Sequence, residues 1–321
     1  MPQITHRFVR ILAATALLVG STLLGACTTN AATGRTQLSL LSRTDEISLG
    51  QEAAPELIIA YGGEVPSAEL QAYVTNIGMK LAAQTEGDNP SLPWSFIFLN
   101  SDVINAFALP GGQVFITRGL VERMDNEAQL AGVLGHEIGH VTARHANNRI
   151  VRQTGLSIAV ALGTAVINPE SEEMQMLVNG LVTGAGVYAL TFDRGQESES
   201  DRLGMRYMSK AGYDPTGQLQ VMHILKDASS GASQPEWLST HPLPQTRIED
   251  IEGLLRDEFA GAVSNPANGL YRERFQSSML SKLNALPAPQ PMSLKDAETI
   301  QRWLAEHTDC ECHEHGSVSA H

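Results

Sequence analysis

Two histidines four residues apart constrain this chain more than any other feature of its sequence. His136 and His140 lie within the run HEIGH. Asn126, with Gln129 three positions on, predicts a capped helix start upstream of the run. Apolar residues then continue at helical spacing through it. This stripe consists of Leu130, Val133, Leu134, Ile138 and Val141. The histidines are therefore expected on one helix.

Residues four apart on a helix point within about 40° of the same direction, so both imidazole rings can face one ion. Glu137, beside the first histidine, is placed to take a proton from a metal-bound water without binding the metal itself. A zinc site of this kind needs a third protein ligand and an open position for water. The alternative is an accidental polar trio on an amphipathic helix.

The acidic segment 196–202 offers candidates for the third ligand. Glu197 and Asp201 are four residues apart, so one carboxylate can reach the metal while the other orients a ligand histidine through its ring N–H. We favour Glu197 as the ligand, and Glu199 points elsewhere. The alternative is a solvated acidic face at the start of a helix.

Two other sources of a third ligand are excluded. His145 follows His140 by five residues, which places it roughly 140° around the helix. The metzincin pattern needs glycine three residues and histidine six residues after the second histidine. This chain has Ala143 and Ala146 at those positions.

Combined with three further segments, these residues resemble the M48 metallopeptidases. The segments are Asn105-Ala106-Phe107-Ala108-Leu109-Pro110-Gly111-Gly112, Thr240-His241-Pro242, and Arg247 six residues after that histidine. The order matches the family over roughly residues 40–255, and the chain looks most like the periplasmic, lipoprotein-type branch. The resemblance implies a gluzincin arrangement with one Zn²⁺ per chain, held by His136, His140 and Glu197, with Asp201 behind the ligands.

The resemblance also places His241 at the site. A histidine there would either stabilise the oxyanion or occupy the open metal position in a resting state, and imidazole chemistry allows both. The alternative is that His241 only caps a proline-rich loop. Arg247 would pair with a carboxylate near the site or with Asp250, and the sequence does not decide between them.

Asn105, Ala106, Phe107 and Ala108 are expected to form the edge strand to which an unfolded substrate adds by backbone hydrogen bonds. An ordinary edge strand closed by a Pro-Gly turn is the alternative. The expected function is a zinc-dependent endopeptidase that hydrolyses unfolded or misfolded envelope proteins, with Glu137 as general base. The competing hypothesis is a chaperone or assembly factor for outer-membrane proteins whose metal site is mostly latent.

The N-terminus predicts export and lipid attachment. Arg7 and Arg10 precede a charge-free apolar run over residues 11–24, as in a signal peptide. The run ends in Leu24-Gly25-Ala26-Cys27, which resembles the lipobox of bacterial lipoproteins. Thr28 is not Asp, which suggests a Gram-negative outer membrane and a protein facing the periplasm. The alternative is that Cys27 merely follows an ordinary cleavage site.

The charge balance limits the partners. The chain has 22 basic and 35 acidic residues, a net charge of −13. Removal of residues 1–26 takes away two basic residues, which brings the net charge to −15. Nucleic acid is therefore an unexpected partner. Attachment to the outer membrane would have to come from lipid at Cys27.

The expected fold is α+β and mostly helical: a gluzincin-type metallopeptidase domain with a small β-sheet beside the HExxH helix. Strands are predicted at 94–99 and 114–117, two helices between 45 and 85, and another helix from about 196 to 211. An apolar helical hairpin at 156–190 could lie beside the site or cover it.

The expected organisation is a signal peptide at 1–26, a lipidated tether at 27–43, a metallopeptidase domain at 44–255 and a helical C-terminal extension at 256–321. The extension ends in a Cys and His cluster containing Cys310 and Cys312. Such a cluster could bind a soft metal; we favour a tail with no functional metal, whose thiols form disulfides in an oxidising compartment.

Overall fold

The computed structural model describes residues 27–87, 89–152, 191–230, 235–242 and 245–289 of the 321-residue chain. The predicted signal peptide, the hairpin predicted at 156–190 and the Cys and His cluster lie outside the described residues.

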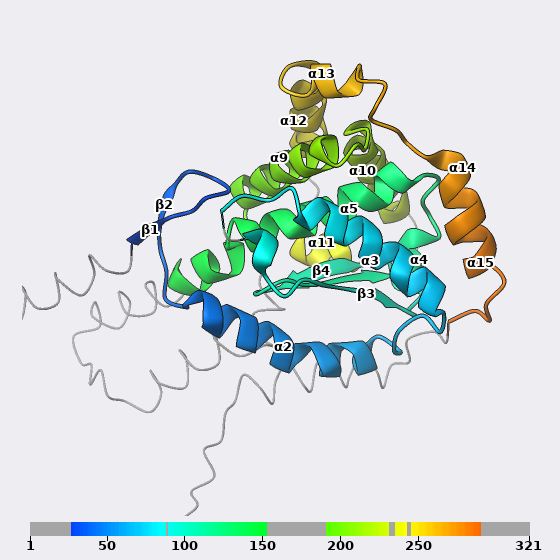
Figure 1. Ribbon diagram of the computed structural model, residues 1–321, viewed down its shortest axis with the longest axis horizontal. Coiled ribbons are helices and arrows are strands. Elements are labelled where there is room, and N and C mark those ends of the chain that lie inside the picture. Colours follow the sequence, from blue (N-terminus) through cyan, green and yellow to red (C-terminus); the bar gives the residue numbers. More distant parts are fainter. Residues whose placement is uncertain (1–26, 88, 153–190, 231–234, 243–244, 290–321) are drawn as a thin grey trace, which may run out of the picture.

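A mixed three-stranded sheet lies at the centre of the fold (Figure 1). It consists of β3 (Ser95–Leu99), β5 (Gln113–Thr117) and β4 (Ala106–Leu109), in that order. β3 pairs with β5 in parallel, and β4 pairs with β5 antiparallel. The strands predicted at 94–99 and 114–117 are confirmed, and β4 is an edge strand among the residues that the structure describes.

Helices cover both faces of this sheet. One face packs against α2 (Arg43–Ala60), and its side chains include Phe107 and Phe115, whose rings stack with centroids 4.5 Å apart. The opposite face packs against α3 (Ala68–Ala82) and α5 (Glu127–Thr142). Figure 1 shows α2 on one side of the strands and α3 and α5 on the other. The α+β, mostly helical fold expected from the sequence is thereby confirmed.

The helix α9 (Arg194–Lys210) packs unusually closely on α5 because glycines line the contact. A Cβ atom added at Gly204 would lie 2.8 Å from the backbone nitrogen of His136, and one at Gly139 would lie 3.0 Å from the Cα of Ser200. Side chains at these positions would separate the helices. The close approach brings the first turns of α9 beside the HEIGH run.

The remaining elements complete the helical layers around this pair. They are η1 (Asn89–Ser91), α4 (Arg118–Val121), α10 (Thr216–Ser229), α11 (Trp237–Thr240), α12 (Gln245–Arg256), α13 (Ala260–Val263), α14 (Arg272–Phe275), a π-helical turn (Gln276–Leu280) and α15 (Ser281–Leu283). The sequence did not predict α10, which packs against α5.

The segment 27–43, for which the sequence predicts a lipidated tether, has regular secondary structure. It contains an antiparallel hairpin of β1 (Cys27–Thr29) and β2 (Thr36–Leu38). Asn30 closes the turn by accepting hydrogen bonds from the backbone of Ala32 and Thr33, and its amide donates to the carbonyl of Thr142 at 2.8 Å. Asn30 therefore fixes the hairpin to the end of α5.

The residues after 255 also pack more closely than a separate extension would. Phe275, Met279 and Leu283 are fully buried in the main core. Arg274 pairs with the buried carboxylate of Glu127 at the start of α5. The described part of the C-terminal segment thus shares the core of the domain.

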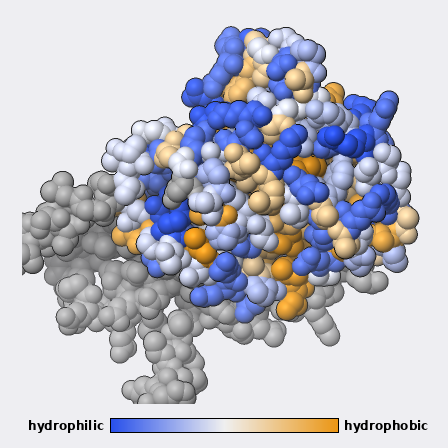
Figure 2. Space-filling view, viewed as in Figure 1, coloured by the Kyte–Doolittle hydropathy of each residue, from blue (hydrophilic) through white to orange (hydrophobic). Residues whose placement is uncertain are grey.

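Hydrophilic residues predominate on the face shown in Figure 2, with smaller hydrophobic patches between them. The large hydrophobic side chains exposed among the described residues are Leu40, Ile59, Met79 and Val263. Within the described ranges, we find no helix with the length and apolar character needed to cross a membrane.

Candidate active site and metal centre

The helix α5 turns the two predicted ligand histidines toward one point. The Nε2 atoms of His136 and His140 lie 3.0 Å apart, and both residues are buried. Two nitrogens bound to one tetrahedral zinc ion at about 2.0–2.1 Å would be separated by about 3.3 Å. The spacing of the two rings therefore fits a shared metal ion.

Glu197 and His241 complete a group of four potential ligands. One ligand atom from each of these residues and from the two histidines of α5 lies within 4.8 Å of all the others. Glu197 Oε1 lies 3.3 Å from His140 Nε2 and 3.0 Å from His241 Nδ1. Imidazole nitrogens and a carboxylate form a donor set that suits zinc. The expected cofactor, Zn²⁺, thus fits the residues that the structure brings together.

Asp201 lies directly behind the first histidine. Its Oδ1 accepts a hydrogen bond from His136 Nδ1 at 2.9 Å and another from Gln218 Nε2 at 2.7 Å. With the proton on Nδ1, the Nε2 atom of His136 carries a lone pair toward the metal position. This geometry suits the orienting role that the sequence predicts for Asp201.

Arg247, whose partner the sequence could not decide, pairs with the two carboxylates of α9. Its Nε and Nη2 atoms donate to Asp201 at 2.6 and 2.8 Å, and its Nη1 lies 2.5 Å from Glu197 Oε2. Arg247 is 2% exposed, so this charge network is fully desolvated.

The network sets the charge states of both carboxylates. Burial acts to raise the pKa of Asp201, but the Arg247 guanidinium and the hydrogen bond from His136 outweigh it and lower the pKa to about 2. Burial likewise opposes ionisation of Glu197, and the charges of His241 and Arg247 hold its pKa well below the usual range. Both groups are therefore anionic at neutral pH.

The pKa values of His140 and His241 shift in opposite directions. Burial lowers the pKa of His140 well below its usual value, although Glu197 acts against this shift. Burial also acts to lower the pKa of His241, but the carboxylates of Glu197 and Glu137 outweigh it and raise that pKa. His140 is thus a neutral ring, as a metal ligand must be.

Glu137 contacts a tryptophan that sequence reasoning missed. Trp237 Nε1 donates to Glu137 Oε1 at 3.3 Å, and His241 Nε2 lies 3.7 Å from the same oxygen. The indole stacks on the His241 ring, with centroids 4.7 Å apart and planes at 15°. The sequence signal was available: Trp237 and His241 are four residues apart, as expected of neighbours on one helical turn.

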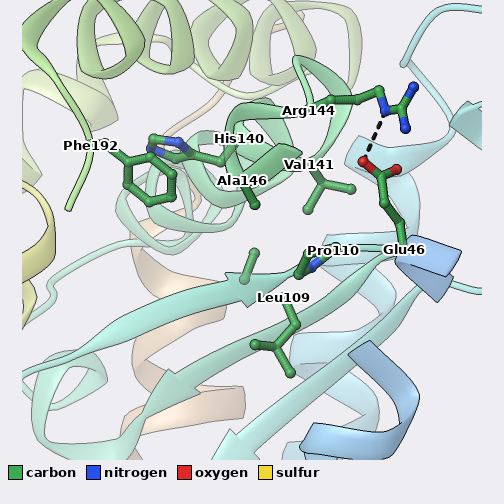
Figure 3. Close-up of a pocket in the computed structure, with 9 residues that line it drawn as sticks. Glu46, Leu109, Pro110, His140, Val141, Arg144, Ala146 and Phe192 are labelled. Carbon is green, nitrogen blue, oxygen red and sulfur yellow. Dashed lines mark hydrogen bonds and ion pairs between the residues drawn. The ribbon is translucent and has the colours of Figure 1, made fainter. Parts of the chain in front are cut away.

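Phe192 covers the site from the segment before α9. Its ring centroid lies 3.9 Å from that of His140 and 5.2 Å from that of His241, and its backbone N–H donates to the Thr240 carbonyl at 3.1 Å. Figure 3 shows Phe192 against His140 at one end of a small pocket. The pocket is otherwise lined by Glu46, Ala108, Leu109, Pro110, Val141, Arg144 and Ala146.

The predicted substrate strand lies next to this pocket. The Thr117 N–H donates to the Asn105 carbonyl at 3.0 Å. Because hydrogen-bonded and non-bonded pairs alternate along an antiparallel ladder, the backbone groups of Ala106 and Ala108 point away from β5. Phe107 packs its ring toward α2, and the Asn105 amide donates to the Tyr61 hydroxyl at 2.9 Å.

A HExxH helix, a carboxylate from a following helix close to both histidines and a general-base candidate on the first helix are typical of the class of zinc metallopeptidases. Comparison with known families gives the narrower assignment. Residues 68–255 match the family described as Peptidase family M48, which is more than half of the chain. The chain belongs to this family, as its motifs indicated.

Two curated relatives illustrate the breadth of the family. The beta-barrel assembly-enhancing protease of Yersinia pestis is 36% identical over 186 residues, which cover 56% of this chain and 38% of that protein. The mitochondrial metalloendopeptidase OMA1 of Schizosaccharomyces pombe is 31% identical over 215 residues, which cover 65% of this chain and 61% of that protein. The chain therefore spans well under two thirds of the length of the Yersinia relative.

Proposed function

We propose that this protein is a zinc-dependent endopeptidase that cleaves unfolded or misfolded proteins, with Glu137 as the general base. One observation carries the proposal: His136 Nε2, His140 Nε2 and Glu197 Oε1 converge in a buried site. Glu137 follows the first ligand on the same helix. Asp201 holds the ring of His136, which supports a rigid ligand set.

The roles of the chain's own residues follow from this arrangement. Zinc bound at these atoms would supply a Lewis acid that polarises a water molecule and the scissile carbonyl. Glu137 would accept the proton of the attacking water on its carboxylate and deliver it to the leaving amine. Phe192 and Trp237 would exclude bulk water from the site.

We propose that substrates bind as an added strand on β4. The alternation along the ladder turns the backbone groups of Ala106 and Ala108 away from β5; Ala108 is partly exposed, whereas Ala106 is buried. Backbone pairing of this kind gives affinity with little sequence selectivity, which suits an enzyme for unfolded chains. Asn105 and Phe107 would hold the strand in place rather than contact the substrate backbone.

We also propose that the resting enzyme is latent, with His241 in the fourth metal position. His241 Nδ1 lies 3.4 Å from His136 Nε2 and 3.0 Å from Glu197 Oε1. A tetrahedral ion with four protein ligands has no position for water. Trp237 in addition contacts the general base in this state. A mostly latent site would also allow the second function, that of an assembly factor, and the name of the Yersinia relative joins assembly and proteolysis.

For localisation, we propose a periplasmic lipoprotein anchored to the outer membrane through lipid on Cys27. The lipobox-like sequence ending at Cys27 supports this, and β1 begins at that residue. The family alone does not decide the compartment, since its members include mitochondrial proteins. Incorporation of labelled palmitate by the wild type but not by Cys27→Ala is expected; equal labelling would contradict the assignment.

The catalytic proposal is tested by separating metal binding from proteolysis. Glu137→Gln should keep one zinc ion per chain and lose cleavage of casein, whereas Glu197→Ala should lose the zinc as well. Metal content is measured by mass spectrometry on the dialysed proteins. Cleavage that survives in Glu137→Gln would remove Glu137 from the catalytic role.

Latency is tested with His241→Ala. If His241 occupies the fourth position, this variant should cleave casein faster than the wild type. If it is as slow as the wild type, or slower, His241 instead assists catalysis or holds the fold, and the latent state has another origin.

A further inference from the structure

His145 is a buried histidine on the metal-binding side of the fold that is not one of the converging ligands. It lies just after α5 and is 0% exposed. Its Nδ1 is 2.9 Å from His140 Nδ1, and its Nε2 is 3.0 Å from Glu199 Oε2. His145 therefore bridges a predicted zinc ligand and a carboxylate on α9.

The positions of the protons in this chain of groups follow from their chemistry. Glu199 is a carboxylate and can only accept, so the contact at 3.0 Å requires a proton on His145 Nε2. A neutral His145 then has a lone pair on Nδ1. For the contact at 2.9 Å to be a hydrogen bond, His140 must carry its proton on Nδ1. The Nε2 atom of His140 is then left with a lone pair directed at the metal position.

We propose that His145 and Glu199 are positioning residues that fix His140 as the Nδ1–H tautomer and thereby prepare its Nε2 for zinc. The inference rests on the proposed zinc site. His145 provides an acceptor for the Nδ1–H of His140, just as Asp201 provides one for the Nδ1–H of His136; both of these N–H groups face away from the metal position. Both ligand rings are then held in the form that binds a cation.

The opposite tautomer would leave the contact between His145 and Glu199 unsatisfied. If His140 carried its proton on Nε2, it could donate to Glu197 Oε1 at 3.3 Å. Its Nδ1 lone pair would then require a proton on His145 Nδ1. A neutral His145 would in turn direct its Nε2 lone pair at the Glu199 carboxylate. The Ser200 hydroxyl lies 3.3 Å from His145 Nδ1 and can donate to a lone pair there, which is compatible with the first arrangement.

The chain of contacts from His140 through His145 to Glu199 also reaches the N-terminal hairpin. Arg35, next to β2, forms an ion pair with Glu199. The Arg35 side chain is 65% exposed, so we expect this outer pair to contribute little. The positioning effect comes from the contact of the buried His145 with the partly buried Glu199, whose Oε2 also accepts from Arg35.

Zinc affinity separates this role from a general effect on folding. His145→Leu should weaken zinc binding by about 10–100-fold, measured by competition with a chromophoric chelator. His145→Asn should recover much of the affinity, because the asparagine oxygen can take the place of Nδ1 as acceptor. Thr142→Val is the matched control. It removes a buried hydroxyl at the end of α5, 3.0 Å from the Tyr207 hydroxyl, and should lower stability without changing zinc affinity.

Nitrogen-15 NMR of the zinc-free wild type reads the tautomer directly and does not depend on the folding of a variant. The proposal predicts Nδ1–H for His140 and Nε2–H for His145. An Nε2–H tautomer at His140, or unchanged zinc affinity in a folded His145→Leu, would overturn it. If the wild type itself binds no zinc, the proposed metal site fails. If the wild type binds zinc and the folded His145→Leu variant binds it equally well, the metal site stands and only the inference about His145 fails.

Discussion

Replacing Arg247 with methionine would remove the positive charge that neutralises two buried carboxylates behind the metal centre. The guanidinium donates twice to Asp201, at 2.6 and 2.8 Å, and its Nη1 lies 2.5 Å from Glu197. Methionine keeps much of the apolar stem. Asp201 and Glu197, each 1% exposed, would lose their counter-charge. Breaking a buried pair in this way costs about 3–5 kcal/mol.

The assay is urea unfolding of the zinc-free protein near pH 7, so that zinc binding does not add to the measured free energy. Arg256→Met is the matched control on the same helix. Its partner Glu252 lies at 3.7 Å, and the two side chains are 69% and 42% exposed. An exposed pair of this kind contributes about 0–1 kcal/mol. The difference between the two variants therefore isolates burial.

A loss below about 1 kcal/mol in Arg247→Met would refute the reasoning, because it would mean that the carboxylates do not depend on this charge. A double-mutant cycle adds a second check. Asp201→Asn combined with Arg247→Met should cost less than the sum of the single changes, since the partners are in contact. Strict additivity would contradict a coupled network.

Three further substitutions test the packing of α9 on α5, the charge of Asp201 and the role of β4. Gly204→Ala would place a Cβ 2.8 Å from the backbone nitrogen of His136, so it should cost about 1–3 kcal/mol of stability and weaken zinc binding in chelator competition; unchanged affinity would contradict the close-packing argument. Asp201 has a folded-state pKa of about 2 against a usual value of 3.8, so it stabilises the fold above about pH 4 and loses this contribution as pH falls toward 2. Asp201→Asn should therefore remove about 2 kcal/mol of the acid-dependent loss of stability in the zinc-free protein, and an unchanged pH profile would exclude this role. Ala108→Pro should reduce casein cleavage in a His241→Ala background while keeping zinc bound, whereas Phe107→Pro should disrupt the sheet; equal effects of both prolines would argue against strand addition.

Much of the site could be predicted because its chemistry requires fixed spacings. The histidines of the HEIGH run share one face of a helix, and Glu197 and Asp201 share a face of another. Such periodicities are local and can be seen in the sequence. The partner of Arg247 could not be chosen, because that contact depends on how α12 packs against α9.

The parts that were missed depend on contacts between distant segments. Phe192 and Trp237 look like ordinary aromatic residues until tertiary packing places both against His241. The sequence set His145 aside as a ligand from its angle on the helix, and its contact with Glu199 depends on how α9 packs. The hairpin before residue 40 looked like a tether because its composition is polar and small. Asn30 nevertheless supplies the turn and the anchoring hydrogen bond.

The central claim, a zinc peptidase site kept latent by His241, is tested most directly by measuring casein cleavage in His241→Ala with and without Glu137→Gln. The account predicts that His241→Ala cleaves faster than the wild type and that adding Glu137→Gln abolishes the released activity while zinc stays bound. Equal cleavage by the single and double variants would contradict the account, because the activity would then come from chemistry that does not use Glu137.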